Sequence, residues 1–85
     1  MSDPRATCLW WMSFADPHRR RGQQFLGVLI LRAATWEEAV TASHRLKLNP
    51  GGEIQFIELP LPVADQWIGR LLTKAEAQSV EPIGV

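Results

Sequence analysis

Two apolar runs in the first part of the chain predict two β-strands. Residues 8–15, CLWWMSFA, and residues 25–32, FLGVLILR, are each about one strand long and rich in aromatic or branched side chains. Asp16-Pro17 ends the first run, and a polar loop with three arginines and Gly22 follows it. An antiparallel hairpin is the simplest connection between the two strands.

The pattern then changes to a helical period. Thr35 and Glu38 have the spacing of a capping box, in which the threonine accepts from the amide three residues on and the glutamate reaches back. The positions that share one face at helical spacing are Trp36, Ala39, Val40, Ser43 and Leu46. The helix is predicted to end at Leu46 or Lys47, because Asn-Pro-Gly-Gly at 49–52 stops it and turns the chain.

Residues 53–59, EIQFIEL, alternate in part between polar and apolar positions and predict a third strand. The predicted faces carry Ile54 and Phe56 on one side, and Gln55, Ile57 and Leu59 on the other. Pro60 and Pro62 follow. Proline has no amide hydrogen to donate to a central ladder, so the strand is predicted to end there.

The last part of the chain combines an ambiguous segment with a short helix. Residues 64–72, ADQWIGRLL, show helical spacing of apolar positions, but Gly69 interrupts the pattern. A helix and a loop are therefore alternative interpretations of this segment. Thr-Lys-Ala-Glu at 73–76 is a second capping box and predicts a helix over about 74–79. The resulting β-β-α-β-α order predicts an α+β fold, a small, mostly antiparallel three-stranded sheet with one main helix packed on one face.

The 85 residues predict a single domain, 1–85, with loose ends at 1–6 and 80–85. Both faces of its first two strands are apolar, which one helix cannot cover. A bare apolar face usually marks an interface, so we expect a homo-oligomer, a dimer or higher, unless residues 64–79 close the second face. The side chains expected at the interface are Trp10, Trp11, Met12 and Phe14.

Charge and cysteine content exclude several classes of function. The nine basic and nine acidic side chains give a formal charge of zero, which disfavours general nucleic-acid binding but leaves room for a local basic patch. Cys8 is the single cysteine and no Cys/His cluster has metal-ligand spacing, so no intrachain disulfide, metal or cofactor is expected. Without an apolar signal region or a stretch long enough to cross a bilayer, we expect a cytoplasmic protein with no membrane contact.

Catalysis has little support in the sequence. No Ser/His/Asp or Cys/His pair lies at a suggestive local spacing. Glu53 and Glu58 lie five residues apart on one predicted strand, so they point to opposite faces and cannot act as an acid–base pair. We therefore expect a protein that is not an enzyme.

Two segments are candidate anion sites. His18, Arg19, Arg20 and Arg21 form a basic loop beside a glycine, and an arginine fork matches a phosphate or carboxylate. Gly51 and Gly52 can present successive amides to an anion. A solvated hairpin loop and a plain tight turn are the alternative interpretations of the two segments.

The four tryptophans are a third candidate, because an exposed indole can stack on a base or anchor a protein partner. Trp10 and Trp11 are adjacent in a strand and must point to opposite faces. Trp67 and one of these two are the residues expected in a ligand or interface role.

Four segments together, SFAD at 13–16, FLG at 25–27, NPGGE at 49–53 and LLT with Glu76, resemble a group of short uncharacterised proteins from phages and bacterial genomes. The resemblance implies a phage or mobile-element accessory protein that works by stoichiometric binding. One hypothesis is that it sequesters a nucleotide-type signal of host defence. The alternative is a protein-binding inhibitor or adaptor of a host or defence complex, acting through an apolar aromatic face.

Overall fold

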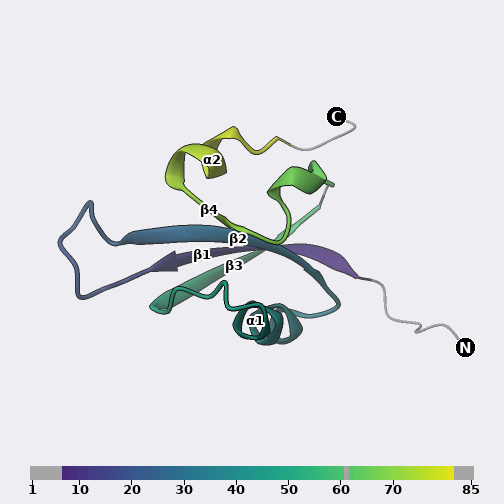
Figure 1. The fold of residues 1–85 in the computed structure, drawn as a ribbon, viewed down its shortest axis with the longest axis horizontal. Coiled ribbons are helices and arrows are strands. Elements are labelled where there is room, and N and C mark those ends of the chain that lie inside the picture. The colour runs from purple at the N-terminus through teal and green to yellow at the C-terminus, as the bar shows by residue number, and fades with distance from the viewer. Residues whose placement is uncertain (1–6, 61, 82–85) are drawn as a thin grey trace, which may run out of the picture.

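A sheet of four antiparallel strands separates two helical layers in the computed structural model, which describes residues 7–60 and 62–81 (Figure 1). In chain order the elements are β1 (Cys8–Ala15), β2 (Phe25–Ala33), α1 (Trp36–Arg45), β3 (Glu53–Leu59), the 3-10 helix η1 (Asp65–Trp67), β4 (Leu71–Leu72) and α2 (Lys74–Ser79). The strands lie in the order β3-β1-β2-β4, and each neighbouring pair is antiparallel. The β1–β2 hairpin therefore forms the centre of the sheet, and β3 and β4 form its edges.

The α+β class is confirmed, but the sheet has four strands where the sequence predicted three. The additional strand lies in segment 64–72, which is neither one helix nor a plain loop: η1 is followed by a turn and by β4. Gly69 makes this turn possible, because it has a φ of 81° and donates its amide to the carbonyl of Ile30 at 2.9 Å. The turn returns the chain along the edge of β2.

Helix α1 packs on one face of the sheet. The buried residues of this first core are Met12, Phe14, Leu29, Leu31, Ala33 and Ala39. At the start of α1, Thr35 Oγ1 accepts from the Glu38 amide at 3.2 Å, as predicted. Glu38 reaches back to the amide of Ala34 instead of that of Thr35, so only half of the predicted capping box forms. The helix ends at Arg45, one residue before the predicted limit.

Residues 63–80 cover the opposite face of the sheet (Figure 1). The buried residues of this second core are Leu9, Val28, Ile30, Val63 and Leu72. The sequence allowed two outcomes for this face, a subunit interface or closure by the C-terminal segment, and the structure shows closure. The face is covered within one chain, so it no longer argues for an oligomer.

This packing also decides where the four side chains expected at an oligomer interface lie. Met12 and Phe14 are 0% exposed, in the core beneath α1. Trp10 is half-buried on the same face and donates its indole N–H to the carbonyl of Ala33 at 3.2 Å. Trp11 is half-buried on the other face, where it packs against the second core. None of the four presents the bare apolar surface on which the interface prediction rested.

The expected loose ends fall largely beyond the described part of the chain. Residues 1–6 and 82–85 lie outside the described residues. Val80 and Glu81 follow α2 without regular secondary structure, and Val80 packs against the second core. The C-terminal end is thus held to the sheet at least as far as Val80.

Candidate anion-binding site

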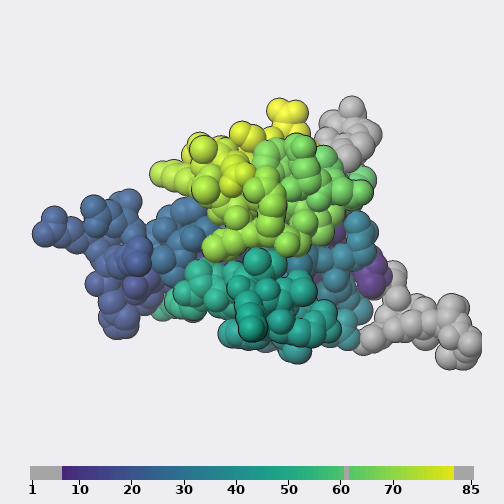
Figure 2. Space-filling view, in the orientation of Figure 1, coloured from purple at the N-terminus to yellow at the C-terminus, as the bar shows by residue number. Residues whose placement is uncertain are grey.

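The loop between β1 and β2 projects from one end of the molecule (Figures 1 and 2). Two turns build it: Arg19 donates its amide to the carbonyl of Asp16 at 3.2 Å, and Gln23 donates to the carbonyl of Arg20 at 2.9 Å. Gly22 has a φ of 87° at the third position of the second turn, the position where a type II turn requires a positive φ. The backbone of residues 16–24, called the arginine loop from here on, is therefore held by two hydrogen-bonded turns and by the positive φ of Gly22.

Side chains hold the loop further and orient Arg19. The Asp16 carboxylate accepts from the amide of His18 at 2.9 Å, and its second oxygen lies 3.5 Å from Nε of Arg19. Gln24 donates its side-chain amide to the carbonyl of Arg19 at 3.1 Å. The Arg19 guanidinium stays exposed, so the ion pair aims the side chain without removing it from solvent.

The turn between α1 and β3 is organised by Asn49. Its side-chain amide donates to Ser43 Oγ at 3.1 Å, and its oxygen accepts from the amide of Gly51 at 2.7 Å. Gly51 and Gly52 follow with φ angles of 87° and 78°. A Cβ on Gly52 would collide with the carbonyl oxygen of Ala15, so this position requires glycine both for its φ and for the close approach of the turn to β1.

The two segments predicted separately as anion sites meet at one hollow of about 470 Å³. His18 and Arg19 of the arginine loop line it together with Gly52 and Glu53, where the α1–β3 turn enters β3, and with Leu26 of β2. This volume is within the usual range of small-molecule sites, about 300–1,000 Å³. The sequence identified the two segments separately. It did not predict that they line the same hollow, because the pairing of β1 with β3 is what brings the α1–β3 turn next to the arginine loop.

The remaining predicted ligand residues lie elsewhere. Arg20 and Arg21 are exposed and do not line the hollow. The amide of Gly51 is bound by Asn49, so it is not free to serve as half of an anion nest. Two carboxylates at the hollow, Asp16 and Glu53, were not among the predicted ligand residues. The Asp-Pro turn was the one sequence signal that pointed toward Asp16.

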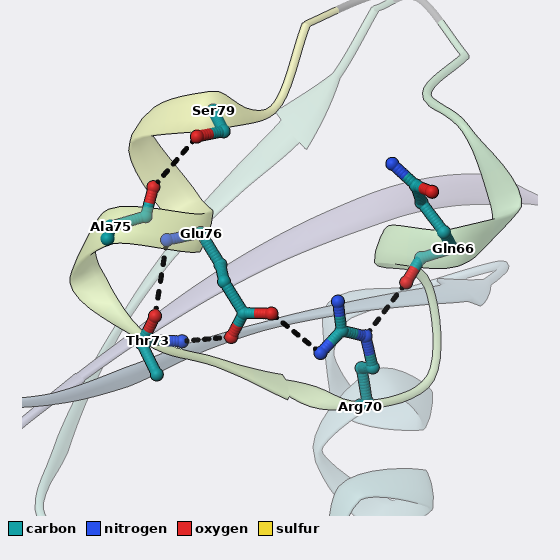
Figure 3. Close-up of polar contacts among 6 residues, drawn as sticks. All are labelled: Gln66, Arg70, Thr73, Ala75, Glu76 and Ser79. Carbon is teal, nitrogen blue, oxygen red and sulfur yellow. Dashed lines mark hydrogen bonds and ion pairs between the residues drawn. The ribbon is translucent and has the colours of Figure 1, made fainter.

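Trp67 lies on the other side of the sheet from α1, in the segment that covers the second core. It is half-buried, and the guanidinium carbon of Arg70 lies 5.6 Å from its ring centroid. Figure 3 shows how Arg70 ties this segment together: its Nε donates to the carbonyl of Gln66 at 2.9 Å, and its Nη1 lies 2.8 Å from Oε2 of Glu76. Trp67 therefore packs against the second core and Arg70, and neither residue lines the hollow at the arginine loop.

Glu76 completes this network through the predicted capping box of α2. Its Oε1 accepts from the amide of Thr73 at 3.1 Å, and the Thr73 hydroxyl accepts from the amide of Glu76 at 3.2 Å (Figure 3). The hydrogen bond from the Thr73 backbone, followed by the contact with Arg70, lowers the pKa of the Glu76 carboxyl.

The lowered pKa of Glu76 predicts an acid-sensitive contribution to stability. A carboxyl whose folded pKa is lower than its unfolded value, about 4.3, stabilises the fold above that pH and loses this effect as pH falls through the folded pKa. Urea unfolding of the wild type and of Glu76→Gln should therefore show a difference in unfolding free energy that shrinks below about pH 4.3. A difference that stays constant across this range would contradict the assignment.

A second hollow, of about 450 Å³, lies between the end of β2 and α1. Its charged side chains include Arg32 and Arg45 but also Glu37 and Glu38. The opposite charges balance, so this hollow has no excess positive charge to attract an anion. Charge alone does not separate the two hollows, since Arg19 at the arginine loop is also accompanied by the acidic residues Asp16 and Glu53. What distinguishes the hollow at the arginine loop is that residues of both predicted anion segments line it.

Cys8 is placed as a structural thiol. It is half-buried at the start of β1, where its Sγ lies 3.6 Å from the carbonyl oxygen of Ala33. Burial, and secondly the nearby Glu58 carboxylate, raise the pKa of the Cys8 thiol. A raised pKa favours the neutral thiol over the nucleophilic thiolate, so the geometry gives this residue no activation.

Comparisons with known proteins give no relative for this chain: no protein-family model, curated protein or solved structure matches it. Across residues 7–60 and 62–81, no three or more His, Cys, Asp or Glu side chains gather in a way that could hold a metal ion. Among the helices of the same residues, none has the length and apolar character needed to cross a membrane.

Proposed function

We propose that this protein binds a phosphate-bearing small molecule of nucleotide type, without turnover, in the hollow between the arginine loop and the α1–β3 turn. The observation that supports this proposal is the convergence of the arginine loop and the double-glycine turn on one hollow of small-molecule size. Arg19 offers a planar set of donors that fits a phosphate, and His18 lies beside it.

The charges around the hollow favour a nucleotide over a simple anion. Asp16 and Glu53 place carboxylates at the same site as Arg19, and carboxylates repel a ligand that is negative throughout. A nucleotide combines a phosphate with ribose hydroxyls and base amino groups, which can donate to carboxylate oxygens. The phosphate side is therefore assigned to Arg19 and the sugar or base side to Glu53.

The biological role that fits such binding is sequestration. Stoichiometric capture of a nucleotide-type signal of host defence, by a phage or mobile-element accessory protein in the cytoplasm, agrees with the resemblance carried by the SFAD, FLG and NPGGE segments. It also agrees with a site that has basic, acidic and apolar walls but no activated nucleophile among the described residues.

Thermal unfolding with a panel of ligands tests the proposal first. The panel contains mononucleotides, cyclic di- and trinucleotides and inorganic phosphate. A ligand that binds only the folded state at a hundredfold excess over its Kd adds about 2.7 kcal/mol of stability, a shift of many degrees in a domain of this size. A nucleotide should give a larger shift than phosphate. A flat panel would overturn the proposal and favour the protein-binding inhibitor or adaptor.

Arg19→Ala is expected to weaken nucleotide binding about tenfold or more, because a charge-assisted pair of hydrogen bonds to phosphate is lost. Isothermal titration at fixed ionic strength measures the change. Arg21→Ala is the matched control, since it removes the same charge from the same loop at a position outside the hollow. Equal losses in the two variants would mean that the loop attracts anions only through its general charge.

A further inference from the structure

The outer edge of β3 is a long, unprotected strand edge. On its inner side, all seven residues of β3, Glu53–Leu59, pair with β1 without a shift in register. Within the described part of the chain, no strand pairs with its outer side, because β3 lies at the end of the order β3-β1-β2-β4. The other edge strand, β4, has only two residues. An open edge of this length presents a row of backbone donors and acceptors to another strand.

Few features within β3 discourage such pairing. Proteins usually protect an exposed edge with proline, lysine or a bulge inside the strand, and β3 has none of these. Its two charged residues, Glu53 and Glu58, lie near its ends, and the four residues between them, IQFI, are uncharged. Pro60 follows the strand and limits pairing only beyond its C-terminal end.

Apolar surface flanks this edge on both faces of the sheet. Ile57 is 58% exposed on the face away from α1. On the α1 face, Trp36 is 47% exposed and packs against Phe56, with the ring centroids 5.0 Å apart. A strand added next to β3 would bury part of both surfaces while it completes the backbone hydrogen bonds.

The sequence of β3 is complementary to itself in an antiparallel arrangement. A two-fold axis perpendicular to the sheet places one residue of β3 opposite its own copy. It also leaves the α1-covered faces of the two sheets on the same side of the joined sheet. With Phe56 at the centre all seven residues pair, and the opposed residues are Phe56 with Phe56, Gln55 with Ile57, Ile54 with Glu58, and Glu53 with Leu59. No two carboxylates are directly opposed, so the register avoids the destabilising like-charge pairs. The formal charge of zero also removes overall repulsion between copies.

We propose that the occupant of this edge is a second copy of the chain, which pairs β3 with β3 to form a dimer with one continuous eight-stranded sheet. The interface differs from the one expected from the sequence, because it uses the edge of the sheet and not a face. It shares only Glu53 with the ligand proposal, because Glu53 lines the hollow while Phe56 and Ile57, at the centre of the proposed pairing, do not. Failure of either proposal therefore leaves the other intact.

Ile57→Lys tests the dimer, with Leu46→Lys as the matched control. Both residues are exposed apolar side chains, at 58% and 48%, but Leu46 is the C-cap residue of α1 and is not part of β3. By sedimentation equilibrium, the wild type should be a dimer, Ile57→Lys should raise the dimer Kd at least about tenfold, and Leu46→Lys should leave it unchanged. Far-UV circular dichroism checks that both variants fold. A monomeric wild type, or equal effects of the two variants, would overturn the proposal.

A disulfide test fixes the register without relying on a destabilising charge. In a Cys8→Ser background, Gln55→Cys combined with Ile57→Cys places a cysteine of one copy opposite a cysteine of the other at two symmetric positions. Oxidation is expected to give a covalent dimer, because directly opposed Cβ atoms lie about 4.5–5.5 Å apart and a small shift of the edge strands brings them to the roughly 3.5–4.5 Å of a disulfide. A dimer in solution that does not cross-link at these positions would refute the register centred on Phe56.

Discussion

Gly52→Ala is expected to destabilise the protein by about 2–4 kcal/mol, since it combines a strained backbone with a collision that cannot relax easily. Gly52 has a φ of 78°, which alanine adopts at a cost. A Cβ there would also meet the backbone of Ala15, whose carbonyl carbon would lie 2.9 Å away. In a domain of this size each kcal/mol lowers the melting temperature by about 4–8 °C, so a loss of roughly 10–30 °C is expected.

Gly51→Ala is the control that separates the two causes. Gly51 has a φ of 87°, but a Cβ on it would meet no atom within 4 Å. Only the conformational cost remains, about 1–2 kcal/mol. Thermal and urea unfolding of both variants measure the difference. Equal destabilisation would mean that the turn does not press against β1 as the structure shows. In that case the closed wall of the hollow at Gly52 would also be in doubt.

The sequence predicted the parts of this fold whose signals are local. The apolar runs of β1 and β2, the alternation of β3 and the capping threonines of the two helices each depend on neighbouring residues, and each element forms where it was expected. The Asn-Pro-Gly-Gly turn was predicted from the same local chemistry. Residue patterns of this kind specify elements, because propensity, capping and turn preferences act over a few residues.

The features that the sequence did not predict depend on contacts between distant segments. Strand β4 has two residues, too few for any periodic pattern, and it forms because Gly69 turns the chain back onto β2. Closure of the second face follows from that turn. The expected interface at Trp10, Trp11, Met12 and Phe14 stays a prediction, but the bare apolar face from which it was argued is covered by the C-terminal segment.

The candidate site shows the same division. Arg19 and the double-glycine turn were identified from composition and local conformation, but their convergence follows from the pairing of β1 with both neighbours. Trp67 was expected in a ligand or interface role because an exposed indole can stack on a base or anchor a protein partner. In the structure it lies across the sheet from α1, under Arg70, where packing explains it.

Leu72→Ala is expected to destabilise the protein by about 2–4 kcal/mol, the usual cost of removing a buried leucine side chain. Leu72 is 1% exposed, pairs with Val28 in the sheet and packs in the second core. Leu46→Ala is the matched control: the same chemical change at a side chain 48% exposed should stay within about 0.5 kcal/mol. Urea unfolding measures both, and similar losses in the two variants would contradict the burial of β4.

Unfolding of Leu72→Ala should remain a single cooperative transition. Strand β2 takes part in both cores, because Val28 and Ile30 face residues 63–80 while Leu29 and Leu31 face α1. Loss of the covering segment would expose the second core and weaken the strand on which the first core is built, so the two layers should unfold together. Hydrogen exchange at the Gly69 amide, which bonds to Ile30, reports on the covering segment. A biphasic transition, with early exchange at Gly69, would show instead that the segment docks onto an independently stable β1–β2–α1–β3 core.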